Sequence, residues 1–139
     1  MTSSKDWAVI AAEAAAEKKA EDVMAINVAE LLVVTDYFVI ATGRTNIQVR
    51  AIADEIEEQL RVRGGIKVIG REGADEAKWL LLDFGDLVIH VFQPEEREFY
   101  RLEKLWSDAP RLKLPAAVAN VTHDADSELP AAGTASSAE

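Results

Sequence analysis

Residues 78–106 constrain the fold of this chain more than any other stretch. Two apolar runs, Trp79 to Leu82 and Leu87 to Phe92, flank the link Asp83-Phe84-Gly85-Asp86. Both runs have the length of a strand, and a short glycine-containing link between two such runs predicts a β-hairpin. The second run is apolar at odd and even positions alike, so both of its faces should be covered. This pattern predicts a central strand of a sheet.

A helix should follow the hairpin. Pro94 ends the second strand and suits the first turn of a helix, where its missing N–H costs nothing. Three glutamates come next, which favours the positive end of a helix dipole. We expect one continuous helix, with Phe99 and Trp106 facing the core and Tyr100 and Glu103 to one flank. The apolar stripe of this helix would contain Phe99, Leu102, Leu105 and Trp106.

Helices and strands are also predicted in the part of the chain that precedes residue 78. The patterns indicate a helix over residues 4–20, strands over 22–28, 37–42 and 66–69, and a helix that begins after Thr45. Thr45 and Gln48 match a capping box, and Gly64-Gly65 should stop that helix. Residues 70–77 are polar and predict a loop. The succession of strand, helix and strand between residues 37 and 69 predicts a parallel crossover.

These elements together predict an α/β fold in one domain. The expected architecture is a mixed sheet of about five strands with helices on both faces. Residues 113–139 differ in composition, because they are rich in Ala, Pro, Ser and acidic residues and contain no aromatic residue and no period. Such a segment is typical of a disordered tail. We therefore expect the folded domain over residues 1–112 and the tail over residues 113–139.

Charge and composition exclude several classes of function. The formal net charge is −10, of which residues 113–139 contribute −3, so residues 1–112 carry −7. Phosphates repel an acidic surface, which argues against nucleic acid as the main partner and favours a basic protein. No apolar run approaches the ~20 residues that a membrane-spanning helix needs. The chain has no cysteine, which fits a cytoplasmic protein.

Long motifs carry a resemblance to a known family. Trp79-Leu-Leu-Leu-Asp-Phe-Gly-Asp-Leu-Val-Ile-His-Val-Phe is followed by Arg97-Glu-Phe-Tyr-Arg-Leu-Glu-Lys-Leu-Trp106. The match continues upstream through Asp36-Tyr-Phe-Val-Ile-Ala-Thr-Gly43 and Gln48-Val-Arg-Ala-Ile-Ala53. Over roughly residues 5–112 the chain resembles the ribosomal silencing factor family, also called the Iojap family. The resemblance is specific because the motifs are long and occur in the family's order.

The resemblance implies a ribosomal silencing factor that performs no chemistry and needs no cofactor. Family members bind the large ribosomal subunit through its basic protein numbered fourteen, and they block joining of the small subunit. They thereby repress translation when nutrients are scarce. The family also forms homodimers, which sequence alone does not decide for this chain. The family's partner-binding positions that match here are Trp79, Tyr100, Leu102 and Glu103.

The alternative function is a nucleotide-binding enzyme, since the family's fold is similar to that of nucleotidyltransferases. Such enzymes need a Gly-Ser turn and paired carboxylates that bind metal ions. Here Arg44 follows Gly43, and no Asp-x-Asp follows at suitable spacing. We therefore expect a nucleotidyltransferase-like topology without the catalytic site. Asp36, Asp83 and Asp86 are the candidate magnesium ligands that this alternative would require.

Two further features have ordinary structural explanations. Asp83-Phe84-Gly85 spells the magnesium-binding tripeptide of kinases, but the chain lacks the Gly-rich loop and catalytic loop that accompany it. His90 is the one histidine of residues 1–112. A single histidine in a strand is more typical of a hydrogen-bonded core or rim residue than of a base. With no cysteine and no second histidine in residues 1–112, we expect no metal site.

Overall fold

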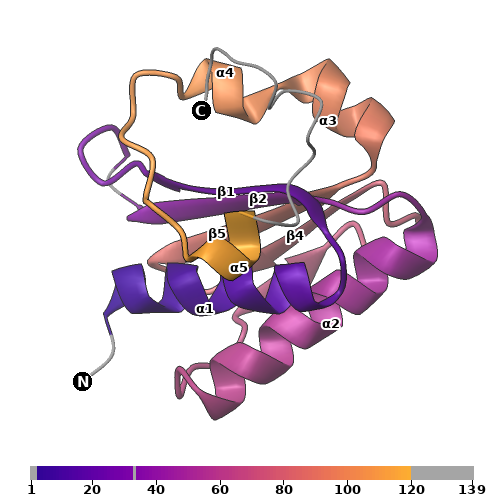
Figure 1. Ribbon diagram of the computed structural model, residues 1–139, viewed down its shortest axis with the longest axis horizontal. Helices are drawn as coiled ribbons and strands as arrows, with labels where there is room; N and C mark the ends of the chain where they lie inside the picture. The colour runs from indigo at the N-terminus through magenta and orange to yellow at the C-terminus, as the bar shows by residue number, and fades with distance from the viewer. Residues whose placement is uncertain (1–2, 33, 120–139) are drawn as a thin grey trace.

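The computed structural model describes residues 3–32 and 34–119, which form three layers with a sheet in the middle (Figure 1). Helices α1, α2 and α5 cover one face, and α3 and α4 cover the other. The elements in chain order are α1 (Ser4–Glu17), β1 (Glu21–Asn27), β2 (Tyr37–Thr42), α2 (Asn46–Val62), β3 (Gly70–Glu72), β4 (Trp79–Asp83), β5 (Leu87–Phe92), α3 (Pro94–Tyr100), α4 (Leu102–Leu105) and α5 (Ala116–Ala119).

The five strands lie in the order β1-β2-β5-β4-β3. The β2–β5 pair is parallel, and the other three pairs are antiparallel. The predicted mixed sheet of about five strands with helices on both faces is therefore confirmed. Strand β5 lies at the centre of the sheet, as its two apolar faces indicated. The hairpin of β4 and β5 also forms where the sequence placed it.

Strand β5 contributes to two separate cores. Leu87, Ile89 and Val91 are buried with residues of α1 and α2 on one face. Phe92 is buried on the other face, where Leu102 and Trp106 pack against its cluster. Because alternate residues of a strand point to opposite faces, one apolar run serves both layers of helices.

Helix α1 packs against the sheet through an alanine-rich face. Its buried residues are Ala8, Ile10, Ala11, Ala12, Ala14 and Ala15. The hydroxyl of Ser3 caps the helix by accepting the N–H of Asp6 at 3.3 Å. The helix ends at Glu17 rather than at the expected residue 20. Lys19 has a φ of 65°, which lies outside the right-handed helical region and stops the helix.

Helix α2 follows its predicted pattern closely. The Thr45 hydroxyl accepts the N–H of Gln48 at 3.0 Å. The expected capping box is incomplete, because the Gln48 side chain accepts the N–H of Arg44 instead of that of Thr45. Gly65, with a φ of 70°, follows the end of the helix in the left-handed conformation. The buried stripe consists of Val49, Ile52, Ala53, Ile56 and Leu60.

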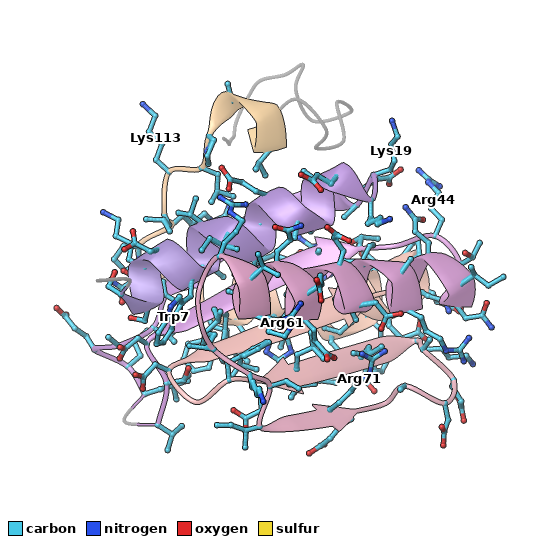
Figure 2. All side chains as sticks on the ribbon, turned by 90° about the horizontal axis from the view of Figure 1, so that it is seen from below. Trp7, Lys19, Arg44, Arg61, Arg71 and Lys113 are labelled. Carbon is cyan, nitrogen blue, oxygen red and sulfur yellow. The ribbon has the colours of Figure 1, made fainter. Side chains whose placement is uncertain are left out.

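The third strand lies later in the chain than the sequence predicted. Residues 66–69 have no regular structure, whereas Gly70–Glu72, expected in a polar loop, form β3 and pair with β4. An edge strand has one paired neighbour and one open side, so polar residues can occupy it. Arg71 of β3 lies beside α2, where it pairs with Glu57 at 2.5 Å (Figure 2). The crossover from β2 to β3 is parallel in direction but passes over β5 and β4.

The prediction of one continuous C-terminal helix is wrong. Helix α3 ends at Tyr100, and Arg101 adopts the left-handed conformation with a φ of 47° before α4 begins. Because of this break, the residues of α3 and those of α4 do not form the single apolar stripe that one continuous helix would have. Leu102 and Trp106 still pack against the sheet, but Phe99 is 78% exposed instead of facing the core.

Packing contacts continue beyond residue 112, where the sequence predicts the end of the domain. Residues 110–112 run beside β1, where Leu112 donates its N–H to the carbonyl of Ala25 at 2.8 Å. Helix α5 then lies against α1, and its Val118 is fully buried in the core of α1 and α2. The rest of the expected tail, residues 120–139, lies outside the described residues.

Truncation tests the contribution of residues 113–119. A chain that ends at residue 112 should melt about 5 °C or more below a chain that ends at residue 119. Burial of one valine stabilises by about 1.5 kcal/mol, and each kcal/mol shifts the midpoint by several degrees. Val118→Asp should reproduce this loss in the full chain, while Ala116→Asp, at an exposed position of the same helix, should not. Equal melting temperatures of the two truncated chains, measured by circular dichroism, would show that α5 does not contribute.

Candidate protein-binding surface

Two of the three candidate magnesium ligands lie side by side, since the N–H of Asp36 donates to the carbonyl of Asp86 at 2.9 Å. Asp36 accepts a hydrogen bond from the hydroxyl of Ser4 at 3.2 Å. Asp83 accepts the N–H of Gly85 at 2.8 Å, which stabilises the turn between β4 and β5 where Gly85 has a φ of 88°. Among residues 3–32 and 34–119, no group of three or more His, Cys, Asp or Glu side chains could hold a metal ion. Asp36 and Asp83 thus have structural contacts.

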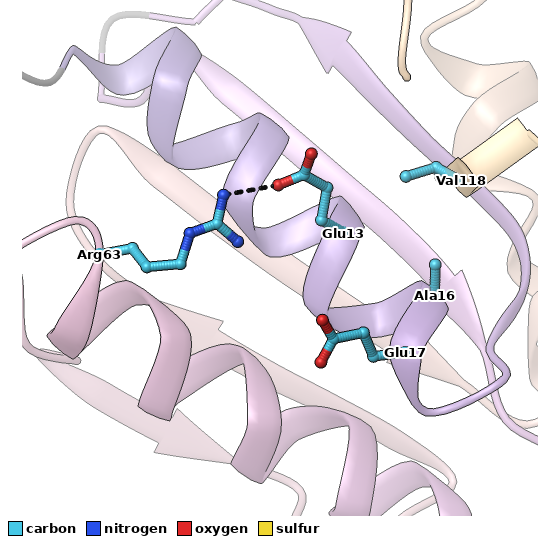
Figure 3. Close-up of a pocket in the computed structure, with 5 residues that line it drawn as sticks. All are labelled: Glu13, Ala16, Glu17, Arg63 and Val118. Atoms are coloured by element: carbon cyan, nitrogen blue, oxygen red, sulfur yellow. Dashed lines mark hydrogen bonds and ion pairs between the residues drawn. The ribbon is translucent and has the colours of Figure 1, made fainter. Parts of the chain in front are cut away.

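A cavity of about 380 Å³ lies between α1, α5 and the end of α2 (Figure 3). Its charged lining consists of Glu13, Glu17 and Arg63, and Arg63 donates to Glu13 at 2.8 Å. Ala16 and Val118 form the apolar part of the lining. This combination contains no nucleophile beside a general base, so it offers no recognisable catalytic arrangement.

His90 is a buried, hydrogen-bonded residue of the second sheet face, as the sequence indicated. Its Nδ1 accepts the indole N–H of Trp79 at 3.1 Å. Burial lowers the pKa of the His90 imidazole from 6.5 to about 4. The ring is therefore neutral near pH 7, and its proton lies on Nε2 because Nδ1 acts as the acceptor. His90 orients an aromatic side chain instead of exposing a base to solvent.

An exposed aromatic surface lies next to this histidine. We use the term aromatic surface for Trp79, Phe99 and Tyr100. The ring centroids of Trp79 and Tyr100 are 4.5 Å apart, and those of Phe99 and Tyr100 are 5.0 Å apart. Tyr100 is 46% exposed and Phe99 is more exposed still. Because Tyr100 contacts the partly buried Trp79, two rings from distant parts of the sequence form one contact area.

Three of the four predicted binding residues lie on the second face of the sheet: Trp79, Tyr100 and Leu102. Trp79 and Tyr100 are in direct contact, as described above. Leu102 follows the left-handed Arg101 and is partly buried against the second core. Phe99 was missed as a surface residue because a continuous helix would have turned it inward. The sequence carries no local signal of this outcome, because the break at Arg101 contains no glycine or asparagine.

Glu103 is not a free surface carboxylate. Both of its oxygens accept from Nε of Arg97 at 3.2 Å. The Arg97 side chain is 9% exposed and that of Glu103 is 27% exposed, so Glu103 covers a buried guanidinium. Glu103 therefore has an intramolecular contact in addition to its predicted place among the binding residues. Residues six positions apart do not meet on a continuous helix, and only the break at Arg101 allows this pair.

Together, the fold and this surface define a small mixed α/β protein with exposed aromatic residues beside a partly buried ion pair. Residues 1–138 match the family described as "Ribosomal silencing factor during starvation". The chain is 50% identical over 101 residues to the ribosomal silencing factor RsfS of Bacillus subtilis, covering 73% of this chain and 85% of that protein. The chain belongs to the ribosomal silencing factor family. The resemblance seen in the sequence is thus confirmed.

Two further similarities extend the comparison. The crystal structure of protein CV0518 from Chromobacterium violaceum superposes with a TM-score of 0.73 at 31% identity, covering 76% of this chain and 88% of that one. The mouse protein named "Mitochondrial assembly of ribosomal large subunit protein 1" is 38% identical over 96 residues, covering 66% of this chain and 41% of that protein. Within the described part of the chain, no helix is long and apolar enough to cross a membrane.

Proposed function

We propose that this protein binds the large ribosomal subunit in the cytoplasm through the subunit's basic protein numbered fourteen. Bound there, it blocks joining of the small subunit and so represses translation when nutrients are limiting. The observation that carries the proposal is the aromatic surface, in which the exposed Tyr100 lies on the ring of Trp79. Blocking requires only occupancy of a surface, so no chemical step is needed.

The composition of the aromatic surface suits a protein partner. Aromatic side chains provide large contact areas with few rotatable bonds, and they are enriched among residues that dominate binding energies. Phe99 and Tyr100 are already held edge to face before any partner arrives. Less conformational entropy is therefore lost on binding than for two flexible side chains.

The charge of the protein supports a basic partner. Residues 1–112 carry a net charge of −7, and α3, the helix that bears Phe99 and Tyr100, has Glu95 and Glu96 in its first turn. Attraction between opposite charges accelerates association and weakens as salt is added. The name of the mouse relative, which refers to the large ribosomal subunit, supports the choice of subunit.

Tyr100→Ala tests the proposal. The variant should keep its fold and bind purified large subunits about thirtyfold more weakly, because loss of an interface anchor costs ~2 kcal/mol or more. Val62→Ala, at an exposed apolar position of α2 on the opposite helical layer, is the matched control and should bind like the parent. Co-sedimentation with large subunits measures binding, and sucrose-gradient reassociation measures subunit joining.

Three results would overturn parts of the proposal. Equal binding by Tyr100→Ala and the parent would show that the aromatic surface is not the interface. Binding to large subunits without calorimetric binding to the isolated protein numbered fourteen would reject that partner alone. Saturable binding of a nucleoside triphosphate with magnesium would instead support the nucleotide-binding alternative.

A further inference from the structure

Arg97 joins four elements through one buried guanidinium. Its Nη1 donates to the hydroxyl of Thr42, at the end of β2, at 2.7 Å. Its Nη2 donates to the carbonyl of Asp22 in β1 at 2.9 Å, where the β1–β2 register is irregular and Asp22 has a φ of 49°. Its Nε donates to Glu103 of α4, while Arg97 itself belongs to α3. The acceptors thus come from three elements other than its own.

This arrangement is specific to the planar geometry of arginine. The guanidinium presents its donors in a rigid fork, so three acceptors in different directions fix its position and its plane. A lysine keeps the positive charge but offers a single nitrogen, which cannot reach acceptors spread over β1, β2 and α4. An apolar residue would fill the space without setting any direction. The polar contacts therefore determine how α3 and α4 are oriented on the sheet.

The contact between Arg97 and Glu103 spans the break that creates the aromatic surface. Arg97 lies three residues before Tyr100, and Glu103 lies three residues after it. Between Tyr100 and Leu102 the chain passes through the left-handed Arg101, a conformation that is unfavourable for a residue other than glycine. The contact between Arg97 and Glu103 holds the two sides of this break together. Without it, α4 would lose its side-chain hydrogen bonds to α3.

We infer that Arg97 is the positioning residue of the binding surface: it holds α3 and α4 so that Tyr100 lies on Trp79. The inference rests on the proposed function for its biological meaning, since the surface matters only if it binds a partner. Arg97 is too buried to contact that partner directly, with 8% of the residue exposed. It acts through Glu103 and through the end of α3.

The fluorescence of Trp79 provides a test that does not need the ribosome. A background with Trp7→Phe and Trp106→Phe leaves Trp79 as the one indole of the chain. In this background Tyr100→Ala defines the signal of an uncovered Trp79, measured as emission maximum and acrylamide quenching. Arg97→Lys should shift both quantities toward that signal. Arg44→Lys makes the same substitution at an exposed arginine that pairs with Glu21 at the start of β1 and does not contact Glu103, and it should leave both quantities unchanged.

Binding supplies the second readout. In the otherwise native chain, Arg97→Lys should bind large subunits at least tenfold more weakly than the parent, while Arg44→Lys should bind equally well. Unchanged Trp79 fluorescence in a folded Arg97→Lys would overturn the positioning role. Arg97→Met is the second variant if Arg97→Lys fails to fold. Collapse of both variants would also overturn the inference, since Arg97 would then be required for the whole domain.

Different experiments would reject the proposed function and the positioning role of Arg97. Tyr100→Ala that uncovers Trp79 yet binds normally rejects the proposed function and leaves the positioning role to be judged by fluorescence alone. Arg97→Lys that binds weakly with Trp79 still covered rejects the positioning role and leaves the proposed function in place.

Discussion

Glu103→Lys should destabilise the domain by ~3 kcal/mol, the lower end of the range found when one partner of a buried ion pair is removed, because this pair is partly buried. The substitution leaves the guanidinium of Arg97 buried without its carboxylate and adds a second positive charge beside it. Since a domain is stable by only ~5–15 kcal/mol, this loss is a large fraction of the total. We expect the melting temperature to fall by about 10 °C or more.

Two controls separate this effect from a general loss of acidity. Glu98→Lys makes the same charge change at an exposed glutamate of α3 that pairs with Arg101, and it should change stability by less than about 1 kcal/mol. Glu103→Gln keeps an acceptor for Arg97 and should lie between the parent and Glu103→Lys. Urea unfolding followed by circular dichroism measures all three. A Glu103→Lys protein as stable as Glu98→Lys would mean that Arg97 finds another acceptor.

Ile56→Asp should prevent folding. Ile56 is fully buried in the middle of α2, between the helix and the sheet, and belongs to the larger of the two cores. A carboxylate at this position loses its hydration without gaining a partner, at a cost of several kcal/mol. Loss of the isoleucine side chain adds the ~2–5 kcal/mol of a large cavity. The sum is comparable with the whole stability of the domain.

Ile47→Asp is the matched control for this variant. Ile47 lies in the first turn of the same helix but is 74% exposed, and a carboxylate there suits the helix dipole. It should therefore unfold at the same urea concentration as the parent or slightly above it. A cooperative urea transition for Ile56→Asp at the midpoint of the Ile47→Asp control would refute the assignment of Ile56 to the core.

Regular patterns made much of the fold predictable from sequence. Strand β2 and strand β5 begin and end where the apolar runs do, and the two apolar faces of β5 correctly indicated its central place. Helix α2 has both a polar cap and an uninterrupted apolar stripe, so its start and its buried residues were also clear. In these elements the local preference and the tertiary contacts agree.

The errors arose where tertiary contacts override local preference. Gly70–Glu72 is polar and has no apolar alternation, yet it forms a strand because the edge of β4 offers backbone partners. The break after Tyr100 carries no glycine or asparagine, so the sequence gives no local sign that Arg101 is left-handed. Val118 joins the core from a segment whose composition resembles a tail.

The residues of the candidate site were proposed from the sequence, whereas their contacts come only from the structure. Tyr100 could be selected as an aromatic residue to one flank of the predicted helix, and the resemblance pointed to both Trp79 and Tyr100. The pair of Arg97 and Glu103 could not be found, because a continuous helix places residues six apart on different faces. Their contact depends on the same unsignalled break, which also turned Phe99 outward.

The parallel pairing of β2 with β5 has a consequence for how the protein acquires its shape. The hairpins β1–β2 and β4–β5 can close locally within microseconds, but Tyr37 pairs with Leu87, fifty positions later in the chain. Closing so long a loop makes the centre of the sheet the slow step of folding. During synthesis, residues 37–42 must wait for residues 87–92 to leave the ribosome. The aromatic surface, which needs β4 and α3 as well, is completed only when nearly all of the described chain has been made.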